Sequence, residues 1–146
     1  MDWFTKAFLK ASLSWLALGV SLGVAMAVYP PLAVYRTAHL HLNLLGFVTM
    51  MIFGVAYHVI PRFTGHPLHS RRLAGVHWWV ANAGLLTFVL GFAASVNGFA
   101  FARILIAAGG LASALGAYAF VFNVWRTIDG RDHARSRGGS ALPVRS

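Results

Sequence analysis

The sequence predicts an all-α integral membrane protein, a four-helix bundle with both termini in the cytoplasm. Only 10% of the 146 residues are charged and 58% are hydrophobic, whereas an average soluble domain is about 25% charged. Four apolar stretches each exceed the roughly 20 residues that a helix needs to cross a bilayer. We therefore expect a transmembrane domain over about residues 1–128, with helices at about 8–29, 37–60, 73–96 and 99–125.

Prolines and short polar turns separate the four stretches. Pro30 and Pro31 end the first, Pro61 ends the second, and Asn97-Gly98 divides the third from the fourth. Within hydrocarbon the backbone amides must be satisfied inside their own segment, which favours helices over open strands. Because the connections are short, neighbouring helices should pack antiparallel.

Lysine and arginine are unevenly divided between the two ends of the predicted bundle. Only Arg36 and Arg103 fall at one end, and the other ten fall at the end that holds the N-terminus: Lys6, Lys10, Arg62, Arg71, Arg72, Arg126, Arg131, Arg135, Arg137 and Arg145. An excess of positive charge marks the cytoplasmic side of a membrane protein. The charge of +9 is thus explained by a membrane with a lipid partner, and we expect no nucleic-acid partner; the localisation that we expect is the bacterial inner (cytoplasmic) membrane.

The C-terminal segment 129–146 contains Gly138-Gly139 and Pro143 and shows no apolar periodicity. Such a composition predicts a mobile cytoplasmic tail.

Composition excludes several kinds of chemistry. The chain has no Cys, and its only acids are Asp2, Asp129 and Asp132. Thiolate metal sites, iron–sulfur clusters and covalent c-type haem attachment are therefore excluded. Paired-carboxylate catalysis is excluded from the body of the protein for the same reason. The remaining groups for chemistry are His, Tyr, Met and the backbone.

Four histidines fall within or at the ends of predicted spanning helices: His39, His41, His58 and His77. Polar side chains are costly there and indicate function, and neutral imidazole ligates haem iron, copper and zinc. His41 and His58 are about 25 Å apart along one helix at 1.5 Å per residue, so one haem cannot join them. His58 and His77 instead form a candidate metal or haem site across the second connection. Anchoring in the headgroup zone is the non-functional alternative for all four.

Helical phase separates the two outer histidines. At about 100° per residue, His39, Asn43, Gly46, Met50 and Tyr57 share one face, and His41 lies some 160° from it. A partner ligand for His41 would be His39, Met26 or a residue of a second subunit. Gly46 leaves room for either a flat macrocycle or a neighbouring helix.

Small residues recur at helical spacing in two of the predicted helices. Gly19 and Gly23 have GxxxG spacing, and further stripes occur in the last helix: Gly109, Ser113 and Ala117, and Ala112 with Gly116. Such stripes predict close helix packing within or between subunits.

Residues 35–46, YRTAHLHLNLLG, and 54–61, GVAYHVIP, resemble the second helix of the catalytic subunit of haem-copper oxidases. The resemblance is to the C-type oxidase and nitric oxide reductase branch. The segment 73–79, LAGVHWW, is similar to a pattern that recurs in that superfamily. The resemblance implies haem b with His41 as axial ligand, or His39 in a shifted alternative. It also implies that Arg36 pairs with a haem propionate and that Asn43, Gly46 and Met50 line the cofactor site.

The resemblance implies a b-type haem protein that serves electron transfer or senses haem, O2 or NO. Copper and zinc are the alternative metals. Family subunits have more helices, and the three copper-ligating histidines have no counterpart here, so we expect no complete oxidase or nitric oxide reductase. The alternatives are the His58/His77 site and a cofactor-free accessory or assembly subunit of a respiratory complex. We expect a homo-oligomer whose second copy completes the site, and a respiratory-chain redox partner.

Overall fold

The computed structural model describes residues 1–130, and this part of the chain is entirely helical apart from short connections. The elements are α1 Trp3–Val28, the 3-10 helix η1 Pro30–Tyr35, α2 Arg36–His41, the π-helix η2 Leu42–Thr49, α3 Met50–Thr64, α4 Arg71–Val96 and α5 Ala102–Asp129. The predicted tail lies outside the described residues, except for Asp129 and Gly130.

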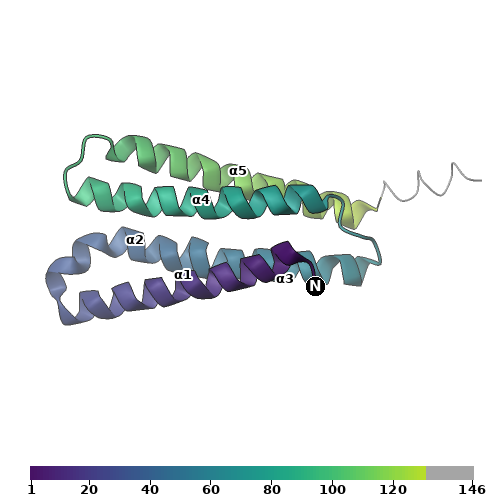
Figure 1. The fold of residues 1–146 in the computed structure, drawn as a ribbon, viewed down its shortest axis with the longest axis horizontal. Helices are drawn as coiled ribbons and strands as arrows, with labels where there is room; N and C mark the ends of the chain where they lie inside the picture. Colours follow the sequence, from purple (N-terminus) through teal and green to yellow (C-terminus); the bar gives the residue numbers. More distant parts are fainter. Residues whose placement is uncertain (131–146) are drawn as a thin grey trace, which may run out of the picture.

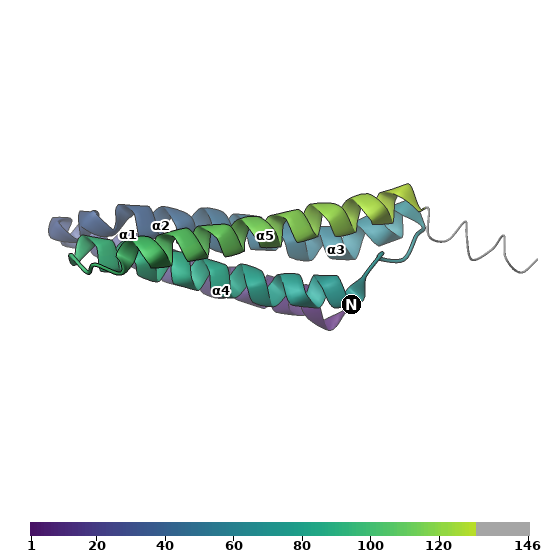
Figure 2. The same cartoon turned by 90° about the horizontal axis from the view of Figure 1, so that it is seen from above.

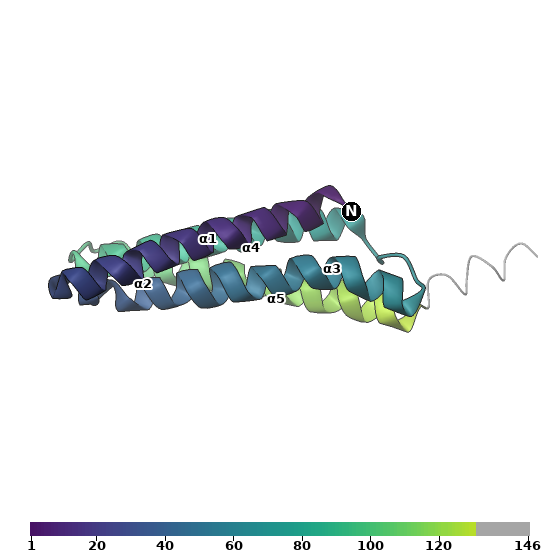
Figure 3. The same ribbon diagram turned by 90° about the horizontal axis from the view of Figure 1, so that it is seen from below.

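Four apolar rods are long enough to cross a membrane: α1, the continuous run Pro30–Thr64, α4 and α5. This confirms the all-α class and the four spans. The rods form two antiparallel hairpins, α1 with α2–η2–α3 and α4 with α5, which lie against each other along their length (Figure 1). The views from above and below show how the two hairpins stack, with α1 along α4 and α3 along α5 (Figure 2 and Figure 3).

The helices extend beyond the apolar stretches of the sequence. α1 begins at Trp3 rather than near residue 8, and α3 continues past Pro61 to Thr64. Gly65 then ends α3 with a φ of 68°, a left-handed conformation that glycine adopts without steric cost. Ser70 caps α4, because its Oγ accepts a hydrogen bond from the Leu73 amide at 3.1 Å.

The basic residues gather at one end of the bundle. The start of α1, the end of α3, the start of α4 and the end of α5 all lie at that end (Figure 1). This basic end holds Lys6, Lys10, Arg62, Arg71, Arg72 and Arg126, whereas Arg36 and Arg103 lie toward the opposite end. Asp2 pairs with Arg71 there and joins the starts of α1 and α4. The charge asymmetry is therefore a property of the fold, and the side of the membrane that each end faces remains a prediction.

The small-residue stripes pack within the chain. In α5, Gly109 lies against the backbone of Phe88, and Ser113 lies against Gly84, both on α4. Gly19 and Gly23 of α1 lie directly against Asn43 and His39 of the second rod. Each contact brings helices to a separation that a larger side chain would prevent, which suits association in lipid.

Candidate functional site

His41 is positioned by the end of α2 and by a π-helix that follows it directly. In this π-helix, η2, the Thr49 hydroxyl donates to the Leu44 carbonyl five residues earlier, at 2.8 Å. π-helical turns inside α-helices are frequent at functional sites. The sequence carries no local signal for this π-helix, so it was found only in the structure.

The His41 ring faces α4, and one of its nitrogens is hydrogen-bonded to the backbone of its own helix. Its ring centroid lies 4.7 Å from that of Phe88 and 4.9 Å from that of Phe92. Its Nδ1 lies 2.8 Å from the Thr37 carbonyl oxygen. Because a carbonyl only accepts, Nδ1 carries the proton, and the lone pair is on Nε2. Metal-bound histidines are commonly oriented by this kind of backbone hydrogen bond.

His39 faces the opposite side, toward α1, as the helical phase predicts. Its Nδ1 donates to the Gly19 carbonyl at 2.8 Å. The Asn43 amide donates to the His39 carbonyl at 2.9 Å, and a Cβ on Gly23 would lie 2.8 Å from His39 Cε1. His39 thus joins the first hairpin, and the structure does not bring it together with His41.

Of the other residues of the expected cofactor site, Gly46 and Met50 are buried in the core. The gap at Gly46 is filled by helix packing, because a Cβ there would lie 2.6 Å from Trp15 Cβ and 3.0 Å from Leu85 Cδ2. Met50 is 2% exposed, and the cavity beside it measures about 50 Å³, whereas ligand pockets hold about 300–1,000 Å³. Arg36 is exposed at the start of α2, near the opposite end.

His58 and His77, the expected pair, have different hydrogen-bond partners in the structure, and the partner of His77 is Tyr57. The Tyr57 hydroxyl and His77 Nδ1 are 2.9 Å apart. His58 instead has its Nδ1 2.9 Å from the Arg62 guanidinium. Adjacent residues on a helix point about 100° apart, so the helix can turn only one of Tyr57 and His58 inward. Tyr57 is the buried one, at 2% exposure.

His77 itself is completely buried in an aromatic cage. Its ring centroid lies 4.9 Å from that of Phe8, 4.6 Å from that of Phe53 and 5.9 Å from that of Phe120. Gly116 leaves room for the ring, since a Cβ there would lie 3.3 Å from His77 Cδ2. This histidine belongs to the core of the basic half of the bundle.

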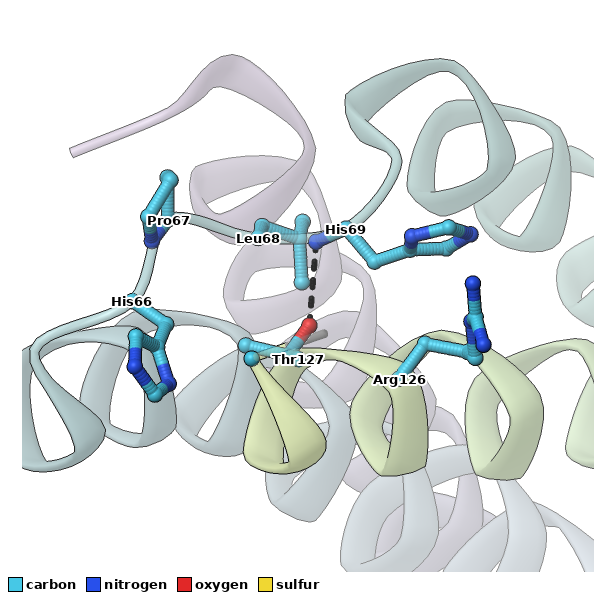
Figure 4. Close-up of a pocket in the computed structure, with 7 residues that line it drawn as sticks. His66, Pro67, Leu68, His69, Arg126 and Thr127 are labelled. Atoms are coloured by element: carbon cyan, nitrogen blue, oxygen red, sulfur yellow. Dashed lines mark hydrogen bonds between the residues drawn. The ribbon is translucent and has the colours of Figure 1, made fainter. Parts of the chain in front are cut away.

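A small pocket of about 50 Å³ lies in the α3–α4 connection at the basic end (Figure 4). Its lining includes His66, His69, Arg126 and Thr127, and the His69 amide donates to the Thr127 hydroxyl at 3.0 Å. Across residues 1–130, no group of three or more His, Asp or Glu side chains is arranged to hold a metal ion. A metal ion at any one place in this part of the chain would therefore have at most two of these side chains as ligands, and its remaining ligands would come from elsewhere.

Four apolar spans, packed as two antiparallel hairpins, define a multi-pass membrane protein. Residues 4–138 match the family model described as cytochrome c and quinol oxidase polypeptide I. The chain belongs to this family, that of haem-copper oxidase subunit I, as its second helix indicates.

Three bacterial relatives are similar to this chain over only a small share of their own length. It is 30% identical over 99 residues to the cbb3-type cytochrome c oxidase subunit CcoN1 of Stutzerimonas stutzeri, covering 64% of this chain and 20% of that protein. It is 29% identical over 131 residues to a cytochrome c oxidase subunit 1 homolog of Agrobacterium tumefaciens, and the match covers 73% of this chain and 24% of that protein. It is 31% identical over 130 residues to a putative cytochrome c oxidase subunit 1-beta of Streptomyces coelicolor, and the match covers 75% of this chain and 22% of that protein. The chain thus spans about a fifth to a quarter of these relatives.

Proposed function

We propose that the chain is a membrane b-type haem protein in which His41 is an axial ligand. The observation that carries this proposal is the orientation of the His41 ring, whose Nδ1–H is held by the Thr37 carbonyl while Nε2 keeps its lone pair. Haem iron is bound by neutral imidazole in this form. Members of the family bind haem, and the haem position that the resemblance implies falls on this residue.

The surroundings of His41 suit a flat apolar macrocycle with charged substituents. Phe88 and Phe92 supply aromatic surface beside the imidazole. Arg36 begins the same short helix, α2, that ends with His41. Its guanidinium would pair there with a carboxylate substituent of the macrocycle. Bound haem would supply one-electron chemistry, with a potential set by ligand identity and burial.

A second axial ligand would come from another chain. The other five histidines in residues 1–130 lie elsewhere: His39 faces α1, and the rest lie toward the basic end. We propose a homo-oligomer in which a second copy contributes this ligand. With the basic end in the cytoplasm, by the positive-inside rule, His41 would lie near the outer face of the bacterial inner membrane. A respiratory redox partner, or O2 or NO in a sensing role, would act there.

The test is the reduced-minus-oxidised visible spectrum and haem content of the purified chain, expressed with adequate haem. We expect haem b bands in the wild-type protein, their loss in His41→Ala, and their retention in the matched control His58→Ala. His39→Gln should also retain them. If haem is absent after expression and after reconstitution, or if His41→Ala binds haem as the wild type does, the proposal is wrong.

A cofactor-free accessory or assembly subunit is the second candidate. It is favoured by the close packing of the bundle, since the cavity beside Met50 measures only about 50 Å³ and Trp15 fills the space at Gly46. Metal analysis showing no iron, copper or zinc, together with a stoichiometric membrane partner on affinity purification, would support this candidate over haem binding.

A further inference from the structure

A groove of about 490 Å³ lies at the basic end of the bundle, where the start of α1 lies beside the start of α4 (Figure 2). Its volume falls within the range of about 300–1,000 Å³ that small-molecule sites occupy. One residue of α1 and five residues of α4 line it: Trp3, Arg71, Arg72, Gly75, Val76 and Trp79. The groove is separate from the region of His41, because α2 lies toward the opposite end (Figure 1).

The α1 wall of the groove is the indole of Trp3. A Cβ on Gly75 would lie 2.9 Å from Trp3 Cζ2, so the glycine gives the indole room to lie against α4. The Trp3 ring also packs edge-on against Trp78, with ring centroids 6.3 Å apart. Trp78 in turn packs against Trp79, with ring centroids 4.6 Å apart. These contacts hold the wall in a defined position relative to α4.

The lining changes from charged to apolar along α4. Arg72, Val76 and Trp79 are spaced four and three residues apart and therefore share one side of the helix. From Arg72 to Trp79 the helix advances about 10 Å, at 1.5 Å per residue. Arg72 lies at the start of a membrane span, so its guanidinium is at headgroup depth and the apolar part of the groove extends toward hydrocarbon. Val76 and Trp79 are 57% and 65% exposed, which leaves their apolar surface open to a ligand.

The charged part of the groove has an excess of positive charge. Asp2 forms an ion pair with Arg71 and so balances one of the two guanidinium groups. Asp129, the other acid in residues 1–130, is not among the residues that line the groove. The lining therefore keeps the positive charge of Arg72. A guanidinium binds phosphate oxygens through paired, charge-assisted hydrogen bonds.

We propose that this groove binds one anionic phospholipid, whose phosphodiester pairs with Arg72 and whose acyl chain lies along Val76 and Trp79. Such a molecule has negative charge where the groove is positive and hydrocarbon where the groove is apolar. The two parts also follow each other in the same order across a bilayer. Tryptophan suits this depth, because indole rings favour the boundary between headgroups and hydrocarbon. Basic pockets between transmembrane helices bind anionic headgroups in this way.

The experiment is native mass spectrometry of the full chain released from detergent micelles and titrated with phosphatidylglycerol or with phosphatidylcholine of the same acyl chains. We expect one phosphatidylglycerol to bind more tightly than phosphatidylcholine. Arg72→Gln should weaken phosphatidylglycerol binding at least about fivefold, the factor that one basic residue contributes near anionic lipid. The matched control is Arg62→Gln, which removes the same charge at the same end from a side chain that contacts His58. Its affinity should stay close to that of the wild type.

A second pair of variants tests the apolar part of the groove. Trp79→Ala should weaken phosphatidylglycerol binding. Trp125→Ala should not, although Trp125 of α5 is 66% exposed and thus as accessible as Trp79. Glycerol phosphate has the charge of the headgroup without the acyl chains, and it should not displace the bound lipid.

Several results would overturn the proposal. Equal affinity of the wild type for the two lipids would show that the groove does not select charge, and this comparison requires no variant to fold. Equal weakening in Arg72→Gln and Arg62→Gln would show a general attraction of the basic end for anionic lipid. Displacement by glycerol phosphate would indicate a site for soluble anions, and a dimer that excludes the lipid would assign the groove to a second copy. None of these outcomes depends on haem binding, so this proposal and the haem proposal stand or fall separately.

Discussion

The close approach of α4 and α5 at Gly109 makes a quantitative prediction. A Cβ at this position would lie 2.6 Å from Phe88 Cα and 2.8 Å from the Gly84 carbonyl oxygen. Both atoms belong to the backbone, so Gly109→Ala can be relieved only by separating two helices along their shared face. Overpacking of this kind costs about 1–3 kcal/mol. The gain in helix propensity from glycine to alanine, at most about 1 kcal/mol, offsets part of this cost.

Gly110 provides the matched control on the same helix. A Cβ there would lie 3.5 Å from Phe88 Cε2, an ordinary van der Waals contact. Gly110→Ala has the same propensity gain without the clash, so the difference between the two variants isolates the packing cost, about 1–3 kcal/mol. Reversible unfolding in mixed micelles measures both free energies. Equal stability of Gly109→Ala and Gly110→Ala would refute the geometry of this interface.

Two further predictions concern the polar groups at the basic end. Tyr57→Phe leaves Nδ1 of the buried His77 unpaired and should lower the free energy of unfolding by about 1–3 kcal/mol, whereas Tyr118→Phe, on a side chain 70% exposed, should change it little. Asn123→Ala removes both hydrogen bonds to Ser70; we expect faster amide hydrogen exchange across residues 65–70, measured by mass spectrometry. Unchanged stability in Tyr57→Phe would contradict the first prediction, and unchanged exchange in Asn123→Ala would contradict the second.

The four spans could be predicted because they depend on local properties of the chain. Length and hydrophobicity decide whether a segment can cross a bilayer, and the structure has four such rods. The opposite directions of His39 and His41 also follow from the sequence, since two residues of one helix differ by a fixed rotation. The structure places them against α1 and α4 respectively.

What could not be predicted depends on contacts between segments far apart in the sequence. In the sequence, Gly46 is equally compatible with a macrocycle and with a neighbouring helix. In the structure, the side chain of Trp15 on α1 fills the space beside Gly46, and its indole donates a hydrogen bond to Asn82 at 3.0 Å. The burial of Tyr57 agrees with the face that it shares with Gly46 and Met50 in the sequence, but its hydrogen bond to His77 on another helix could not be predicted from periodicity. The π-helix shifts the helical phase between His41 and these residues, and it has no signature in the local sequence.

The central claim is that the Nε2 lone pair of His41 binds haem iron, and chemical rescue of a cavity variant tests it most directly. In His41→Gly, the ring is removed and space for a free imidazole remains. We predict that this variant, purified without imidazole, lacks the haem b spectrum, and that adding imidazole with haem restores it. Wild-type-like haem binding by His41→Gly in the absence of imidazole would contradict the claim.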